Sequence, residues 1–330
     1  MYNFPNEIMQ IKNTCELNNL DFKLIDEHSG YLCQITKGNK KIELGVNFIS
    51  SYPINGATAN AIASDKAFCK MILSLSGIKV AKGDVFFISG QYSQLRNSGK
   101  SIQDALIFAK NEIGYPIIAK PNNGAKGNFV QKIFNDDDLK EHLHAMATKY
   151  YATLIEEVII GTEYRVFVID NNVRFAYKKM PVPKEYSNVN EFISEFEEQN
   201  IKRKKLGLNE INKNSESFKS MMKIVQQKRV LYPDTLNIYS GNALVTDFTV
   251  KIPSEIKKLS LEISNSLKLR VFAYDFIAHE EKLKSISKYS DCCVIDVNSN
   301  PMLRSLETIG QTELIYDIWK EVIDKSFKAI

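Results

Sequence analysis

The carboxyl end of one short apolar segment carries residue types that bind a divalent metal. Residues 292–298 read CCVIDVN, so Asp296 and Asn298 end an apolar run and share one strand face, with Cα atoms about 7 Å apart. Asp275 lies within the apolar run 271–277, where a carboxylate is costly unless it is paired or metal-bound. Mg²⁺ prefers such oxygen ligands. A turn cap for Asn298 and a buried salt bridge for Asp275 are the alternatives, but the three residues together favour a metal.

A second feature suited to chemistry is the loop after the apolar run 116–120. Gly124 and Gly127 let backbone N–H groups turn toward one point, as in a phosphate cradle. Lys120 ends the run beside this loop, where its ammonium can reach phosphate oxygens. The sequence does not contain the Walker A pattern GxxxxGK[ST]. A hairpin turn and an edge lysine are the ordinary explanations, and the loop alone does not decide between them.

Carboxylates also gather around a crossover between two predicted strands. Residues 154–165 read LIEEVIIGTEYR, with Glu156 and Glu157 before the glycine and Glu163 after it. Arg165 lies two residues beyond Glu163, so both side chains share a strand face. Taken alone, this segment is a polar connection, and its role depends on the rest of the chain.

The elements that position these residues begin with short strands. Alternating apolar residues punctuated by glycines predict a small strand-rich N-terminal unit. Its predicted strands are residues 22–25, 31–35 and 41–44. A helix follows, capped by Asp65 or Ser64 and ended by Gly77. A second helix runs from Ser101, which forms a capping box with Asp104, to about residue 114.

Longer strands follow residue 153. Residues 163–170 and 173–179 are predicted to pair as a hairpin around the turn Asn171-Asn172. Residues 182–235 are polar and lysine-rich, which predicts a lid or an insertion with helices near 190–199 and 215–228. The other predicted elements are strands 116–120, 129–133, 153–157, 271–278 and 292–298, and helices 137–150, 254–267 and 311–328.

The composition is that of a globular protein and argues against several classes. Hydrophobic residues make up 44% and charged residues 25% of the 330 residues, and no apolar run reaches the length of a membrane span. The first ten residues lack a signal peptide, so we expect a cytoplasmic protein without a membrane partner. The net charge of +4 is spread out, which argues against nucleic acid. The five cysteines show no CxxC spacing and are expected to be buried, reduced thiols.

In their order along the chain, these motifs resemble those of the ATP-grasp superfamily. They are most similar to the ATP-grasp modules of cyanophycin synthetase and bifunctional glutathione synthetase, and more distantly to D-alanine–D-alanine ligase. The similar segments are ASDK (63–66) with GIKV (77–80), GYPIIAKP (114–121), IEEVIIGTEYR (155–165), YDF (274–276) and IDVNSNP (295–301). The third segment is the most specific.

The resemblance implies an α+β fold of mixed α/β character, in which two α+β subdomains clasp ATP. It implies an N-terminal domain at 1–62 and a central subdomain with the glycine loop at 63–157. The C-terminal subdomain, at 158–330, would contain the metal site and the 182–235 insertion.

The resemblance also assigns roles to single residues. The nucleotide would contact Lys66, Lys120, Gly124, Lys126, Gly127, Glu156, Val158, Ile159 and Glu163. Within this set, the lysines and the loop would face the phosphates. Glu156 and the backbone at Val158 and Ile159 would meet the adenine, and Glu163 would bind the ribose. Asp275, Asp296 and Asn298 would hold Mg²⁺. Arg165 and Lys120 would be catalytic, with Arg165 binding the transferred phosphate or the substrate carboxylate.

The implied activity is an ATP- and Mg²⁺-dependent carboxylate–amine ligase that forms an amide or peptide bond through an acyl-phosphate. Its partners would be small carboxylate and amine substrates, such as an amino acid or a peptide, and a homodimer is compatible with the family. A kinase with the same nucleotide site and a non-catalytic nucleotide-binding module remain alternatives. A stable phosphorylated product would indicate the kinase, and ATP binding without turnover would indicate the module.

Three departures from the family bear on the substrate site. Asp296 stands where the family usually has glutamate. Tyr274 replaces a small residue, so we expect it to narrow the acceptor pocket. Residues 178–181 read KKMP where the relatives carry an arginine before the proline. The substrates of the relatives are therefore not carried over to this chain.

Overall fold

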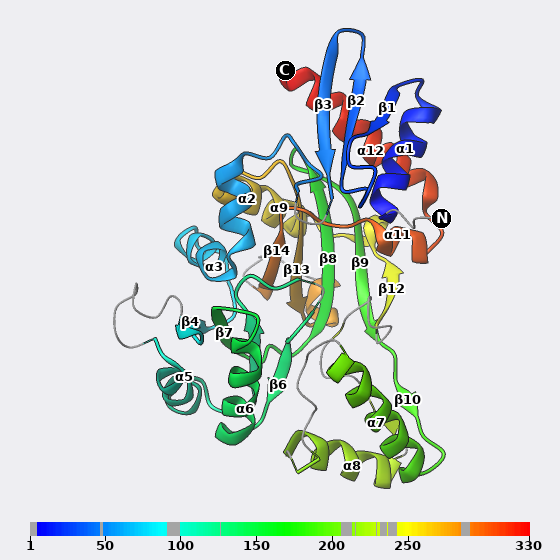
Figure 1. The fold of residues 1–330 in the computed structure, drawn as a ribbon. Helices are drawn as coiled ribbons and strands as arrows, with labels where there is room; N and C mark the ends of the chain where they lie inside the picture. Colours follow the sequence, from blue (N-terminus) through cyan, green and yellow to red (C-terminus); the bar gives the residue numbers. More distant parts are fainter. Residues whose placement is uncertain are drawn as a thin grey trace.

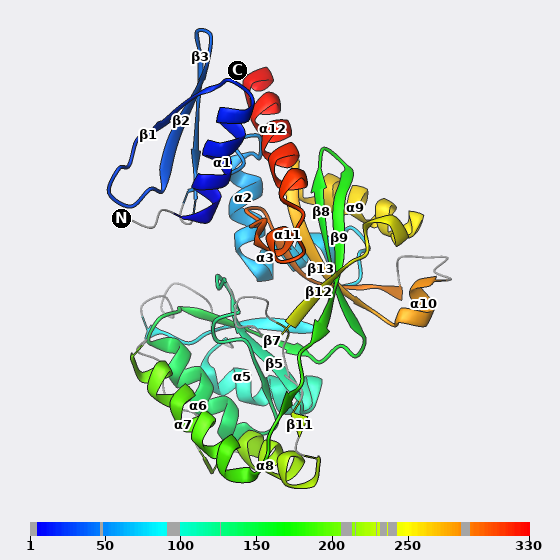
Figure 2. The ribbon, with the colours of Figure 1, turned by 90° about the vertical axis from the view of Figure 1, so that its right-hand side faces the viewer.

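The N-terminal unit of this computed structural model combines both ends of the chain. The structure describes residues 5–46, 49–90, 100–125, 127–205, 213–214, 216–228, 230–231, 236, 243–284 and 291–330. Helix α1 (Asn6–Leu17) precedes an antiparallel sheet of β1 (Asp21–Leu24), β2 (Leu32–Lys37) and β3 (Lys40–Gly45). The C-terminal helix α12 (Thr312–Ala329) packs along α1 (Figures 1 and 2). The predicted strands are confirmed, whereas α1 was not predicted.

A four-stranded antiparallel sheet forms the second unit, drawn in cyan and blue-green in Figure 1. Its order is β4 (Gly83–Phe87), β7 (Ala152–Glu157), β5 (Ile117–Pro121) and β6 (Gln131–Ile133). Helix α5 (Ile102–Phe108), its π-helical extension (Ala109–Ile113) and α6 (Asp136–Ala147) cover one face. The predicted capping box between Ser101 and Asp104 is confirmed.

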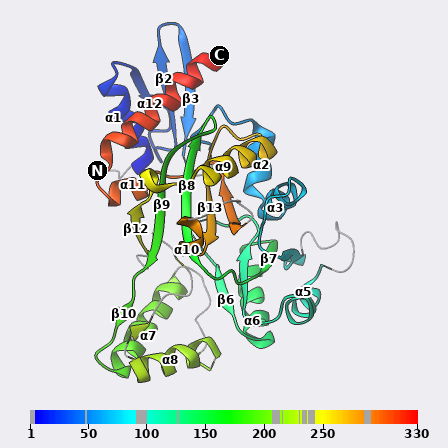
Figure 3. The ribbon, with the colours of Figure 1, turned by 180° about the vertical axis from the view of Figure 1, so that it is seen from behind.

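A five-stranded antiparallel sheet forms the centre of the molecule. Its order is β12 (Ala243–Asp247), β9 (Asn172–Pro181), β8 (Thr162–Ile169), β13 (Val271–Ala278) and β14 (Cys293–Asn298). Helices α2 (Ala57–Ser64), α3 (Lys66–Leu75) and α9 (Ser254–Leu267) cover one face, and Figure 3 shows α9 lying across the strands from behind. The predicted β8–β9 hairpin is confirmed. Its turn lies one residue early, at Asp170 and Asn171, where φ is 45° and 67°.

The segment between β9 and β12 forms a separate helical unit. It contains β10 (Lys184–Glu185), α7 (Val189–Lys205), α8 (Glu216–Lys228) and β11 (Val230–Leu231). These helices bury an aromatic cluster of their own, which includes Phe192, Phe196 and Phe218. The two predicted helices are confirmed. A function as a lid stays a prediction.

The remaining elements are short, and the cysteines match the sequence prediction. Helices α10 (Glu280–Lys284) and α11 (Arg304–Thr308) flank β14. All five cysteines are free and buried. Within the described residues, no helix has the length and apolar character needed to cross a membrane. The predicted domain boundaries stay a prediction, although the packing of α12 joins the last residues of the chain to the N-terminal unit.

Candidate active site

One face of the five-stranded sheet changes from apolar to charged along its strands. Toward the N-terminal unit, alternate residues of β8, β9 and β13 are buried in the largest core, among them Phe167, Phe175 and Ala273. The same alternation continues to the other end of the sheet. There the face carries Glu163, Arg165, Lys179 and Asp275. Buried charged side chains with perturbed pKa values are candidates for a functional site, which makes this end of the sheet a candidate.

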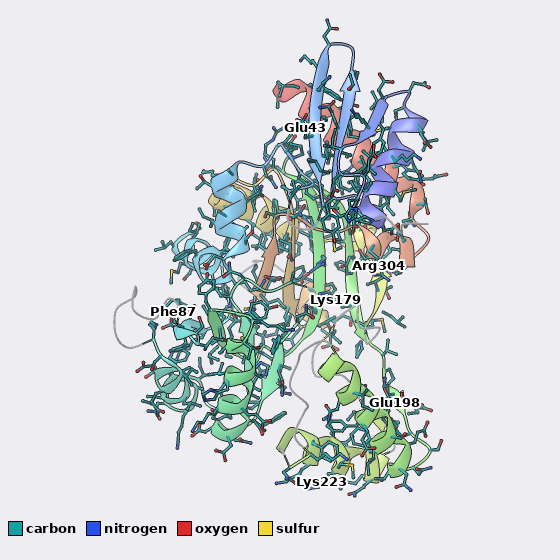
Figure 4. The ribbon with its side chains drawn as sticks, in the orientation of Figure 1. Glu43, Phe87, Lys179, Glu198, Lys223 and Arg304 are labelled. Atoms are coloured by element: carbon teal, nitrogen blue, oxygen red, sulfur yellow. The ribbon has the colours of Figure 1, made fainter. Side chains whose placement is uncertain are left out.

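These four charged side chains form one network. Arg165 binds Asp275 with two hydrogen bonds of 2.6 Å, Nε to Oδ1 and Nη2 to Oδ2. Lys179 Nζ donates to Glu163 Oε1 and lies 3.2 Å from Asp275 Oδ2. Only 6% of the Lys179 and Asp275 side chains is exposed. Lys179, labelled in Figure 4, lies where the central sheet meets the units below it.

The pKa values show how strongly the network depends on its pairing. Burial alone would raise the pKa of Asp275, but Arg165 and Lys179 hold it well below its usual value. Burial alone would lower the pKa of Lys179, but Asp275 and Glu163 raise it. Burial raises the pKa of Glu163 against the opposing effect of Lys179. The network holds two positive and two negative groups, so it is neutral as a whole.

Asp296 and Asn298 lie beside this network on β14. Asp296 is the cross-strand partner of Asp275, next to a bulge at Ile295 of β14. Its Oδ1 accepts a 2.5 Å hydrogen bond from Lys66 Nζ, and its Oδ2 accepts one of 3.2 Å from Asn298 Nδ2. Burial would raise the pKa of Asp296, but Lys66 and then Lys120 lower it. A small cavity between α3 and β14 opens beside Lys66 and Asp296.

The four-stranded sheet contributes a second charged group. Lys120 Nζ lies 2.7 Å from Glu156 Oε2 and donates to the carbonyl oxygen of Ile295 at 3.1 Å. The second contact joins β5 to β14, directly before Asp296. Burial lowers the pKa of Lys120 to about 8, with Asp296 opposing it. Lys120 therefore links the two sheets at the predicted site.

Lys70 also belongs to the candidate active site, although it was not predicted from the sequence. Its Nζ donates to Glu156 Oε1, so Glu156 holds two lysines, one on each oxygen. Burial, and then repulsion by Lys120, lower the pKa of Lys70 to about 6, because one buried carboxylate cannot compensate two ammonium groups. The available signal was the spacing of Lys66 and Lys70, which lie one helical turn apart on α3.

The glycine loop begins next to Lys66. The backbone N–H of Lys66 donates to Asn122 O at 3.2 Å, and Asn122 Oδ1 accepts from the N–H of Ala67 at 2.9 Å. Gly124 is half-buried, and Gly127 is exposed with a φ of 69°. Lys126, a predicted phosphate contact, lies outside the described residues.

The residues predicted to meet the adenine divide into two groups. Val158 and Ile159 are half-buried in the connection between β7 and β8. Glu156 lies between Lys70 and Lys120 and is 3% exposed. The structure thus gathers Lys66, Lys120 and the predicted carboxylates around the junction of the two sheets, while the role of each residue stays a prediction.

The expectation that Tyr274 narrows the acceptor pocket is wrong. Tyr274 is completely buried on the opposite face of β13 from Asp275. Its hydroxyl pairs with Ser260 Oγ at 2.9 Å and donates to Ile256 O at 3.1 Å, both on α9. Neighbouring residues of a strand point to opposite faces, so a tyrosine next to a site carboxylate belongs to the core behind the sheet.

The predicted metal ligands have suitable chemistry. Asp275 and Asp296 face each other on adjacent strands, and Asn298 adds an amide oxygen on the face of Asp296. Two carboxylates and an amide oxygen form an all-oxygen donor set, as Mg²⁺ prefers. Each carboxylate is bound by cationic side chains of the protein. Within the described part of the chain, no three His, Cys, Asp or Glu side chains group as a metal site.

The mixed α+β architecture of the described residues is that of the ATP-grasp fold. Among solved structures, the bifunctional glutathione synthetase from Pasteurella multocida is similar with a TM-score of 0.52 at 16% identity, over 96% of this chain and 44% of that one. The fold class predicted from the sequence is therefore confirmed.

Curated proteins with a similar sequence are enzymes named for D-alanine–D-alanine ligation or for glutathione biosynthesis. A D-alanine–D-alanine ligase of Geobacillus thermodenitrificans is 32% identical over 122 residues, which cover 37% of this chain and 31% of that protein. The bifunctional glutathione biosynthesis protein of Enterococcus faecalis is 24% identical over 261 residues, or 73% of this chain and 32% of that protein. This chain thus spans about a third of their length. No protein-family model matches it.

Proposed function

We propose that this chain is an ATP- and Mg²⁺-dependent carboxylate–amine ligase that forms an amide bond and releases ADP and phosphate. The observation that carries the proposal is the junction of the two sheets, where Lys66 and Lys120 meet Asp296 and the carbonyl oxygen of Ile295. Buried lysines next to oxygen donors suit a magnesium–polyphosphate ligand. The similar ligases support the same activity.

In the proposed reaction, a carboxylate oxygen of the acid attacks the γ-phosphorus of ATP, and the bond to ADP breaks. The amine substrate then attacks the acyl carbon, loses a proton and displaces phosphate. Lys66 and Lys120 would offset the negative charge of the phosphate oxygens. Mg²⁺, held by Asp275, Asp296 and Asn298, would supply charge neutralisation at the transferring phosphoryl group.

Arg165 and Glu163 would complete the site from β8. Arg165 is held bidentately by Asp275, so its guanidinium is fixed in orientation beside the proposed ligands. It is suited to bind the transferred phosphate or the carboxylate of the acid. Glu163 would accept hydrogen bonds from the ribose hydroxyls, while Glu156 and the backbone at Val158 and Ile159 would meet the adenine.

The substrates we propose are small: an acid and an amine, with amino acids or short peptides as the first choice. A homodimer is a further expectation, which light scattering after gel filtration tests. The acid and amine are to be found by incubating the protein with ATP, Mg²⁺ and pairs of candidates, measuring released phosphate and then the product mass.

Lys120→Ala is the decisive variant for this proposal. It should reduce phosphate release at least about a hundredfold, because the positioned ammonium is lost from the phosphate subsite. Lys110→Ala is the matched control, since Lys110 is 68% exposed and its ammonium lies 3.7 Å from Asp136. Retained turnover in Lys120→Ala would contradict the assignment. A stable phosphorylated product would show a kinase instead, and ATP binding without turnover on any pair would show a binding module.

A further inference from the structure

Lys179 connects two parts of the proposed site that have different tasks. It lies on β9, at the side of β8 away from β13. Its ammonium contacts Glu163 on β8 and reaches past that strand to Asp275 on β13. Glu163 is the proposed ribose carboxylate, and Asp275 is a proposed metal ligand. In the sequence, Lys179 belongs to the segment 178–181, which departs from the pattern of the relatives.

The neighbouring cation, Arg165, is paired with a different carboxylate. Arg165 lies on the same strand face as Glu163, but its Nε and Nη2 both bind Asp275 at 2.6 Å. The ammonium of Lys179 is thus the hydrogen-bond donor placed on Glu163 Oε1. With 6% of its side chain exposed, Lys179 has little freedom to move away.

The carboxylate needs such a partner to act on a ribose. An ionised carboxylate is acceptor-only on both oxygens, so it is best suited to bind two ribose hydroxyls when it is held in one orientation. Burial favours the protonated form of Glu163, and Lys179 is the largest opposing influence. Burying a carboxylate without a paired cation is costly, so removal of Lys179 would leave Glu163 protonated or turned away.

We propose that Lys179 is a positioning residue for nucleotide recognition: by holding Glu163 on the charged face of β8, it sets the preference for a ribonucleotide over a deoxyribonucleotide. This inference rests on the proposed function, because it requires a nucleotide bound beside Glu163. Lys179 acts through Glu163 and need not touch the nucleotide itself.

The test compares the affinities for ATP, 2′-deoxyATP and 3′-deoxyATP by calorimetric titration with Mg²⁺ and without acid or amine. Wild-type protein should bind ATP about tenfold or more tightly than the analogue that lacks the bound hydroxyl, as expected for a hydrogen bond to a charged acceptor. Lys179→Met should weaken ATP binding by a similar factor and leave the analogue unchanged. The two affinities then become equal.

Lys178→Met is the matched control. Lys178 is the preceding residue on the opposite face of β9, and its Nζ pairs with Glu280 at 2.6 Å on the surface. It should keep the wild-type preference. Lys179→Arg should retain part of the preference, because it keeps a cation beside Glu163. Glu163→Gln should abolish it, and adding Lys179→Met to Glu163→Gln should change it no further.

The outcomes separate this inference from the proposed function. If wild-type protein binds no nucleotide, the proposed function fails, and this inference fails with it. If wild-type protein prefers ATP and Lys179→Met keeps that preference, or weakens all three nucleotides equally, only the inference on Lys179 is overturned. Should Lys179→Met not fold, Lys179→Gln, which removes the charge but keeps a hydrogen-bonding side chain beside Asp275, provides the same comparison with Glu163 intact.

Discussion

Replacing Asp275 by asparagine tests whether the charged half of the sheet is held together as the structure indicates. The carboxylate is 6% exposed and accepts two hydrogen bonds of 2.6 Å from Arg165 and one of 3.2 Å from Lys179. Asparagine keeps the shape but removes the charge. The network then holds two cations against Glu163 alone. Removing one partner of a buried ion pair costs about 3–5 kcal/mol.

Urea unfolding of the nucleotide-free protein in EDTA measures this loss in the free energy of unfolding. Thermal unfolding gives a second measure. With an unfolding entropy of about 2.1 cal/mol/K per residue over the 330 residues, the melting temperature should fall by about 4–7 °C. Trp319, the single tryptophan, is buried against Tyr52 in the core under the same sheet and reports the transition by fluorescence. Lys320→Ala, which breaks an exposed pair with Asp324, should change the stability by less than about 1 kcal/mol.

The double variant Asp275→Asn with Arg165→Met removes the orphaned cation as well. It should cost less than the sum of the single variants, because the charge left unpaired by the first change is gone. The pH dependence of stability gives a further test. Since the folded pKa of Asp275 is lowered, its pairs stabilise the protein fully above about pH 4, and this stabilisation is lost as the pH falls further. A cost below about 1 kcal/mol at pH 7, or strict additivity in the double variant, would refute the reasoning.

Three further predictions concern Lys70, Tyr274 and the metal. Between about pH 6 and 10.5 the unfolded chain binds a proton at Lys70 that the folded chain lacks, so stability rises with pH. Lys70→Met should flatten this rise in urea midpoints measured at two pH values in that window. Tyr274→Phe should lower the free energy of unfolding by about 1–2 kcal/mol, because its hydrogen bonds to Ser260 and Ile256 are lost, and it should leave KM and kcat unchanged. A raised KM would indicate that Tyr274 contributes to the acceptor site after all. EDTA should stop ADP release, and excess Mg²⁺ should restore it.

Features that depend on neighbouring residues were predictable from the sequence. The capping box at Ser101, the β8–β9 hairpin and the helices of the insertion all follow from local spacing, and the structure confirms them. The shared face of Asp296 and Asn298 also follows from strand alternation, and the two side chains are in contact. These features need no knowledge of the partner strands.

The pairings within the site depend on strand order and were not predictable. Nothing local in the sequence shows that Lys179 reaches past β8 to Asp275, or that Lys70 shares Glu156 with Lys120. These contacts exist because β9, β8 and β13 are neighbours, because β5 lies beside β7, and because α3 packs against β4 and β7. By contrast, the error over Tyr274 was avoidable, because alternation alone puts it on the face opposite to Asp275.

The pairing of the charged groups indicates how a highly charged ligand can enter a buried site. Each cation directed at a phosphate or a substrate anion in the proposed reaction already has a carboxylate partner. The pairs are Lys66 with Asp296, Lys120 with Glu156, and Arg165 with Asp275. A magnesium–nucleotide ligand also carries both signs, so protein–ligand pairs can replace internal ion pairs when it binds. Because leaving one buried charge unpaired is costly, metal and nucleotide should bind together more tightly than either binds alone.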